Sequence, residues 1–210
     1  LRIARRYLVP RQLKEHGLHR RQLAIQDPAV RALIEDTSGS VLSGVTVNFG
    51  TTLGTLSAVS AATTASGIAE VTLTSGTAAG TAVITASASG FTDTVDVQFT
   101  SGAPAGVTVT ATPSTVNPGG ASSLTARVVD GNGNAVVGES VTVDITTNAS
   151  GGSLAAISGT TNVNGDVTVT YTAGSGTGND IIRFRAVSNN TVGTVTVTVD
   201  AGAQAALIKL

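Results

Sequence analysis

The sequence predicts an all-β protein built from two β-sandwich domains in tandem. Two observations carry this prediction: the composition favours strands, and the chain repeats itself once. Val, Thr, Ala, Ser and Gly dominate the 210 residues, Gly alone accounts for 25 of them, and Met is absent. β-Branched residues suit a pleated, half-buried surface, whereas long helices favour Leu, Glu, Lys and Met.

The composition also narrows the possible functions. The hydrophobic fraction of 41% can form a core, which is aliphatic because aromatic residues make up only 3%. With no cysteine in the chain, disulfides, thiolate chemistry and Cys-based zinc sites are excluded. Charged residues are only 12%, about half of the usual ~25%, and such polarity from Thr, Ser, Asn and Gly is typical of secreted or wall-exposed bacterial proteins. No apolar run reaches the ~18 residues of a membrane span.

The internal repeat defines the domains. Asp36, Gly39 and Gly44 recur 94 residues later as Asp, Gly and Gly, and beyond Phe49 the offset becomes 98 because the second copy carries an extra loop at 148–152. A period near 100 residues suits an immunoglobulin-like sandwich domain. The residues that match at the larger offset are Leu56 with Leu154, Gly67 with Gly165, Val71 with Val169, Gly76 with Gly174 and Gly80 with Gly178.

Period-two alternation locates the strands within each repeat. About seven short strands separated by regular turns predict a Greek-key, immunoglobulin-like β-sandwich. We expect Asn164-Gly165 to form a tight hairpin turn, since both residues tolerate positive φ. The expected strands are 45–49, 68–73, 82–86 and 95–99 in the first repeat and 107–111, 124–129, 141–145, 167–171, 181–187 and 195–199 in the second.

We divide the chain into four parts. Residues 1–27 are an atypical basic segment, and residues 28–102 are the first Ig-like domain, whose first strand is uncertain. Residues 103–200 are the second Ig-like domain, joined through Ser101-Gly-Ala-Pro104, whose Pro limits hinge freedom. Residues 201–210 repeat the pattern of 101–109, which predicts the start of a following repeat or a terminal strand.

A longer pattern in the first repeat resembles the bacterial Ig-like domain group 1, which forms the rod-like stalks of intimin and invasin adhesins. The resemblance covers roughly residues 28–200, with a looser match in the second copy, and it implies a stalk module without catalytic residues; some members belong to phage virion proteins. The matching residues are Asp36, Gly39, Gly44, Val45, Val47, Phe49, Leu53, Gly54, Leu56, Thr63, Gly67, Ala69, Val71, Leu73 and Ser75.

The basic N-terminal segment does not read like the first strand that the repeat requires. Seven of the twelve Lys and Arg residues fall within the first 21 positions, opposed there only by Glu15. Three interpretations stay open: a linker from an upstream domain, an interaction arm for an acidic partner, or a local error of reading frame or sequence assignment. The remaining β part is mildly acidic and offers no basic stripe for nucleic acid.

Several short motifs have both a functional and a plain structural interpretation. Asp130-Gly-Asn-Gly-Asn134 begins like a calcium loop but lacks the distal Glu of an EF-hand, so a turn that bonds its own backbone is favoured. His16-x-x-His19 provides two of the three or four protein ligands that zinc needs. Asn148-Ala-Ser150 and Asn189-Asn-Thr191 match glycosylation sequons, which we interpret as incidental.

No pattern supports enzymatic activity. The β domains contain no His or Cys to activate their many serines. The carboxylates of Glu35-Asp36 and of Asp93-x-x-Asp96 are expected to be solvated surface charges, without the aromatic residues that line sugar sites. The glycine-rich stretches 76–80 and 174–178 lack a following helix and a Lys, so phosphate binding is not expected. We therefore predict no enzyme, no cofactor and no catalytic, cofactor-binding or metal-ligating residue.

The leading functional hypothesis is a stalk that spaces a binding tip from a bacterial surface. It implies an extracellular or cell-surface location, or association with a virion, and neighbouring Ig-like repeats as partners. One alternative is a loop-mediated receptor- or glycan-binding module, for example through 148–152. The other is a filament or virion subunit assembled by strand exchange between copies, in which 203–210 adds to an open edge of the first domain.

Overall fold

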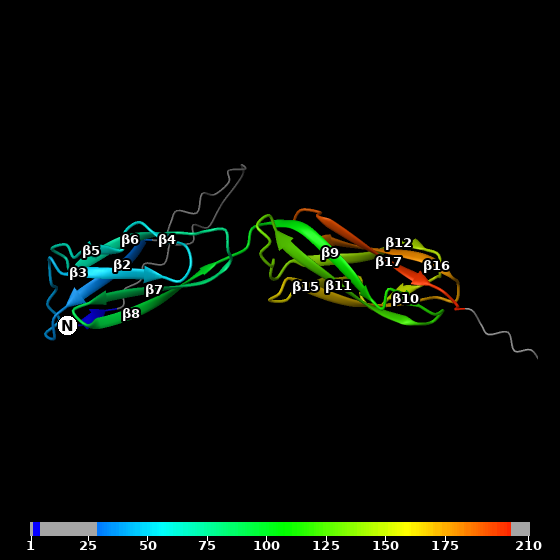
Figure 1. Cartoon of the computed structure of the whole chain (residues 1–210), viewed down its shortest axis with the longest axis horizontal. Helices are drawn as coiled ribbons and strands as arrows, with labels where there is room; N and C mark the ends of the chain where they lie inside the picture. The colour runs from blue at the N-terminus through cyan, green and yellow to red at the C-terminus, as the bar shows by residue number, and fades with distance from the viewer. Residues whose placement is uncertain (1, 5–28, 203–210) are drawn as a thin grey trace, which may run out of the picture. The chain divides into compact units, whose positions relative to one another are not determined.

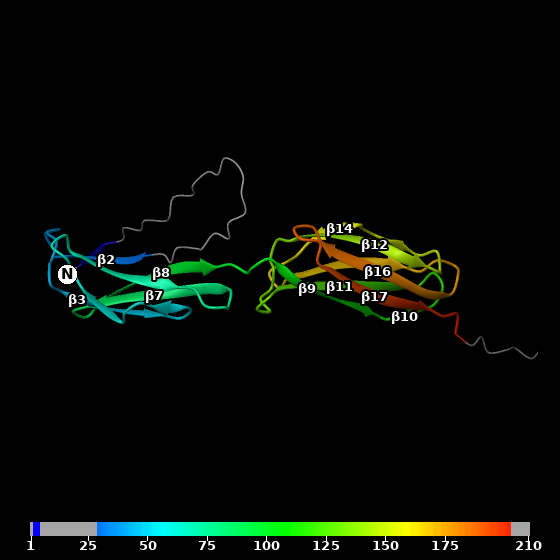
Figure 2. The ribbon, with the colours of Figure 1, turned by 90° about the horizontal axis from the view of Figure 1, so that it is seen from above.

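The computed structural model describes residues 2–4 and 29–202, which form two compact units, residues 1–100 (domain one) and 101–210 (domain two). Figures 1 and 2 show the strands of each unit from two directions. The predicted all-β class is confirmed, because the described residues contain strands and turns and no helix. Accordingly, no helix that could cross a membrane occurs in those ranges.

Domain one is a sandwich of two four-stranded sheets, with strand orders β1-β2-β6-β4 and β5-β3-β7-β8. Its core consists of aliphatic side chains and two phenylalanines, as the low aromatic content predicts. The strands are β1 Arg2–Ala4, β2 Ala29–Glu35, β3 Thr46–Thr51, β4 Thr55–Leu56, β5 Ser60–Ala62, β6 Ile68–Thr74, β7 Gly80–Ala88 and β8 Phe91–Phe99.

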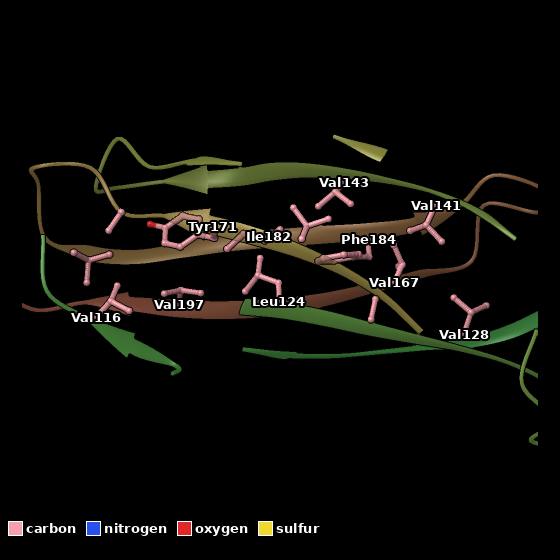
Figure 3. Packing of buried hydrophobic residues seen from close by; sticks show 14 of the residues in the cluster. Val116, Leu124, Val128, Val141, Val143, Val167, Tyr171, Ile182, Phe184 and Val197 are labelled. Atoms are coloured by element: carbon pink, nitrogen blue, oxygen red, sulfur yellow. The ribbon is translucent and has the colours of Figure 1, made fainter. Parts of the chain in front are cut away.

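Domain two repeats this arrangement with one more strand, in the orders β13-β15-β11-β9 and β10-β17-β16-β12-β14. Figure 3 shows Tyr171, Ile182 and Phe184 packed between the two sheets. The strands are β9 Pro104–Thr112, β10 Thr115–Val116, β11 Ala121–Asp130, β12 Ser140–Asn148, β13 Ser153–Leu154, β14 Ser158–Thr160, β15 Asp166–Thr172, β16 Gly178–Ala186 and β17 Val192–Val199.

The strand pairing reproduces the repeat found in the sequence. Val30 of β2 lies opposite Val71 of β6, and Leu124 of β11 lies opposite Val169 of β15. These two pairs are related by the offset of 94 on one strand and 98 on the other. The extra residues of the second copy lie in the turn after β12, as expected for an insertion.

Two details of the predicted strands are wrong. The turn at Asn164-Gly165 does not close a hairpin, because β14 pairs with β12 in one sheet and β15 pairs with β11 in the other. The turn thus carries the chain from one sheet to the other. Within the Asn164-Gly165 pair only Gly165 has a positive φ (77°), and its N–H donates to the carbonyl of Asn162. The strand predicted at 181–187 ends at Ala186, and Val187 is half exposed in the following loop.

The place of the first strand in domain one is held by β1 of the same chain. Ile3 lies opposite Ile34 of β2, which corresponds to Val107 of β9 opposite Val128 of β11. β1 covers only three positions of β2, whereas β9 pairs along almost the whole length of β11. The rest of the basic segment, with His16 and His19, and the segment 203–210 lie outside the described residues.

Candidate functional site

The loop after β12, residues 148–152, is the candidate binding loop predicted from the sequence. Asn148 ties its two ends together: the side-chain N–H of Asn148 donates to the carbonyl of Gly152 (3.0 Å), and its Oδ1 accepts the N–H of Gly152 (2.6 Å). Gly151 adopts a φ of 78°, which favours glycine. The amide of the first sequon is therefore part of the turn.

Beneath the loop lies a buried polar cluster formed by Ser150, Tyr171 of β15 and Asp180 of β16. All three side chains are at most 4% exposed. The Oδ1 of Asp180 accepts the N–H of Ser150 (2.9 Å), and its Oδ2 accepts both the hydroxyl of Ser150 (2.5 Å) and the hydroxyl of Tyr171. The cluster fastens the middle of the loop to one core strand of each sheet, β15 and β16.

The cluster holds its carboxylate ionised. Burial raises the pKa of Asp180, but the hydrogen bonds from Ser150, Tyr171 and the amide of Ala149 outweigh burial and leave that pKa below its usual value. Burial, followed by the bond to Asp180, raises the pKa of Tyr171 to about 12. Neither group exchanges a proton near neutral pH, and none of the three is open to a substrate. The arrangement serves to hold the loop in place.

The described residues of domain one contain no such cluster. The residues that the repeat offset places at Tyr171 and Asp180 are Leu73 and Ala82, and both are fully buried in the apolar core. The polar cluster therefore accompanies the loop insertion of the second copy. The sequence analysis missed this cluster. The signal was Asp180, whose position on β16 faces the core, because a buried carboxylate needs hydrogen-bond partners.

The glycine-rich stretch 174–178 packs against the same loop. The N–H of Gly174 donates to the hydroxyl of Ser150 and the N–H of Gly176 donates to the carbonyl of Ser150. A Cβ at Gly174 would come within 2.1 Å of that carbonyl oxygen. Glycine is needed here for a close approach of two loops.

The turn from Asp130 to Asn134 was the candidate calcium loop. The Oδ1 of Asp130 accepts the N–H groups of Asn132 and Asn134, and its Oδ2 accepts the N–H of Gly102 and the side-chain amide of Asn134, all at 2.8–2.9 Å. These donors, the Asn134 side chain above all, lower the pKa of Asp130 to about 2. Four N–H donors leave these oxygens no lone pair for a cation, which favours the structural interpretation.

The remaining carboxylates of interest are Glu35 and Asp36, at and just after the end of β2, and Asp93 and Asp96 on β8. Asp36 repeats the turn of Asp130, with its Oδ1 accepting the N–H and hydroxyl of Ser38 and the N–H of Ser40. Asp93 and Asp96 lie three residues apart on β8 and so point to opposite faces. Within residues 2–4 and 29–202, no three His, Asp or Glu side chains gather as metal ligands would.

The second sequon, at Asn189, is also engaged. The side-chain N–H of Asn189 donates to the carbonyl of Pro104 at the start of β9, and its Oδ1 accepts the N–H and the hydroxyl of Thr191. Every buried side-chain nitrogen or oxygen of the described residues has a hydrogen-bond partner.

Domain one also matches a known protein family. Residues 26–100 match the family described as bacterial Ig-like domain (group 1). Domain one is a bacterial Ig-like domain of group 1. The resemblance noted in the sequence is thus confirmed for the first repeat, and the matched range ends one residue after β8.

Solved structures extend the likeness over both domains. InvD of Yersinia pseudotuberculosis is 25% identical, with a TM-score of 0.64 over 87% of this chain and 55% of that one. The Yersinia pseudotuberculosis adhesin InvE is 28% identical (TM-score 0.42, 82% of this chain, 53% of that one), and invasin, a bacterial integrin-binding protein, is 26% identical (TM-score 0.46, 84% and 36%). The chain thus spans about half the length of the first two. A comparison with curated proteins finds no match.

Proposed function

We propose that the two domains are a non-catalytic spacer of a bacterial surface protein, holding a binding tip away from its anchor. The observation that carries this proposal is the path of the chain through domain two. The chain enters with β9, where Val107 lies against Gly193 at the start of β17, and it leaves after Val199 at the other end of β17. Six residue steps of ~3.3 Å separate these points by about 20 Å.

Entry and exit at opposite ends let domain two add its own length between its neighbours, which is what a spacer requires. The family match of domain one and the likeness to InvD support the same proposal. The strand β1 supports it as well. This strand of the same chain already pairs with residues 33–35 of β2, at the edge that the strand-exchange alternative needs open for another copy.

A second candidate function is loop-mediated binding through residues 148–152, favoured by the way Asp180 and Asn148 fix that loop. The partner would be a receptor or glycan at the cell surface. Four of the five loop residues are small, and hot spots of binding are usually Trp, Tyr or Arg, so we rank this function below the spacer.

Surface display tests the proposal. A short peptide epitope is displayed on bacteria with the 210-residue chain between epitope and anchor, without the chain, and with a flexible linker of 210 residues instead. We expect the chain to give the strongest capture of cells by epitope-binding beads. Equal capture with the flexible linker would refute the spacer, and bead-independent adhesion that is lost on deleting 148–152 would favour loop-mediated binding.

A further inference from the structure

The start of domain two is fastened by side chains from the end of β11 and from the loop 187–191, which are far apart in sequence. Pro104 is buried, and its carbonyl accepts the side-chain N–H of Asn189 and lies 3.2 Å from the hydroxyl of Thr191. Two residues earlier, the N–H of Gly102 donates to Asp130 at 2.8 Å. The segment 102–104 is thus held although Gly102 itself is exposed.

The loop that provides Asn189 and Thr191 is itself well fixed. The N–H of Asn190 donates to the carbonyl of Ala186, and the N–H of Ser188 donates to the carboxylate of Glu139 (both 2.9 Å). Asn190 adopts a φ of 63°, which Asn tolerates better than most residues. A fixed loop can restrain the segment that it touches.

The repeat shows that this contact is an addition of the second copy. In domain one, β7 and β8 are joined by only Ser89 and Gly90, whereas β16 and β17 are joined by the five residues 187–191. The additional residues include those that reach Pro104. Asn189 therefore has a structural role, because its side-chain amide donates to the backbone of β9.

We propose that Asp130, Asn189 and Thr191 form a linker anchor, which makes residues 102–104 part of the rigid body of domain two. The pivot between the domains is then confined to Thr100 and Ser101, the two residues between the end of β8 and Gly102. The bond from Gly102 to Asp130 precedes the first pair of the β9–β11 ladder, Pro104 with Asp130, and the bond from Asn189 reinforces that pair.

Backbone ¹⁵N relaxation of the intact 210-residue chain tests the anchor. In the native chain we expect the amides of Gly102 and Ala103 to have order parameters near ~0.85, as in strands, and Ser101 to be lower. In the double variant Asn189→Ala, Thr191→Val, the values at 102 and 103 are expected to fall toward ~0.6 or below. The amides of β16 are expected to keep their values, which separates a lost anchor from general destabilisation.

The matched control is Asn179→Ala, which removes a surface bond to Thr198 (3.0 Å) away from the linker and is expected to leave 102–103 rigid. A second variant, Asp130→Asn, removes the charge that receives the N–H of Gly102 and is expected to loosen 102 even if the double variant does not fold. Flexible amides at 102–103 in the native chain would overturn the proposal. Rigid amides there in both the double variant and Asp130→Asn would also overturn it.

Discussion

Removing one hydroxyl from the buried cluster of domain two tests how that cluster works. In Tyr171→Phe the ring keeps its place among the core side chains, but Asp180 loses one of its donors while it stays buried. A hydrogen bond to a charged group contributes about 1.5–3 kcal/mol. We therefore expect domain two to lose about 2 kcal/mol of stability at neutral pH.

Hydrogen exchange of the core amides measures this loss for each domain separately. Every 1.4 kcal/mol corresponds to a factor of ten in an equilibrium constant. The protection factors of the β15 and β16 amides are therefore expected to fall by roughly one to two orders of magnitude. The amides of domain one are an internal control that should not change. Thr170→Val, on the exposed face of the same strand, is the matched control, with an expected effect within about 0.5 kcal/mol.

The pH dependence of the loss follows from the carboxylate. Because the folded-state pKa of Asp180 is lowered, its stabilisation is present above the unfolded-state value of 3.8 and is lost as the pH falls through the lower folded value. The unfolded state is the same for both chains, so the difference between native chain and Tyr171→Phe depends only on the folded-state pKa of Asp180. It should be constant where Asp180 is charged in both chains and shrink in acid as this carboxylate takes up its proton. A loss no larger than that of Thr170→Val at pH 7 would refute the reasoning.

Three further outcomes follow from individual positions. Gly165→Ala should destabilise domain two strongly, since its Cβ would lie 2.5 Å from the carbonyl oxygen of Val128. Gly133 has a similar φ but nothing within 4 Å of its Cβ position, so Gly133→Ala should cost only the ~1 kcal/mol of left-handed strain. Thermal unfolding of the two variants measures the difference. In an NMR titration, the Gly102 and Asn134 amides should shift with a midpoint of about pH 2 as Asp130 protonates, and a midpoint near 4 would contradict its hydrogen bonding. Phe184→Ala leaves a cavity in the core and should cost about 3–5 kcal/mol in denaturant unfolding.

The sequence predicts the sandwich well because strand and core follow from local alternation and from the repeat. Thr63 illustrates the limit of such patterns. It matches the family motif, yet its role becomes visible only in the fold: its buried hydroxyl donates to the carbonyl of Leu42 and accepts the N–H of Val45. Thr161 repeats this bridge in domain two.

The features that sequence reasoning missed all depend on contacts between distant residues. Asp180 and Ser150 are 30 positions apart, and Asn189 and Pro104 are 85 positions apart. Alternation gives the face of a strand but not the loop that lies above it. The hairpin predicted at Asn164-Gly165 was wrong for the same reason, since turn chemistry does not reveal which sheet the next strand joins.

A distance across domain two tests the spacer account most directly. The chain has no cysteine, so Ala105→Cys and Asp200→Cys place two spin labels at exposed positions near the entry and the exit of the domain. The account predicts one narrow distance distribution, centred above the ~20 Å spanned by six strand residues and unchanged when domain one is present or replaced by a flexible tail. A short distance, or a broad distribution in the intact chain, would contradict the claim that domain two adds a fixed length between its neighbours.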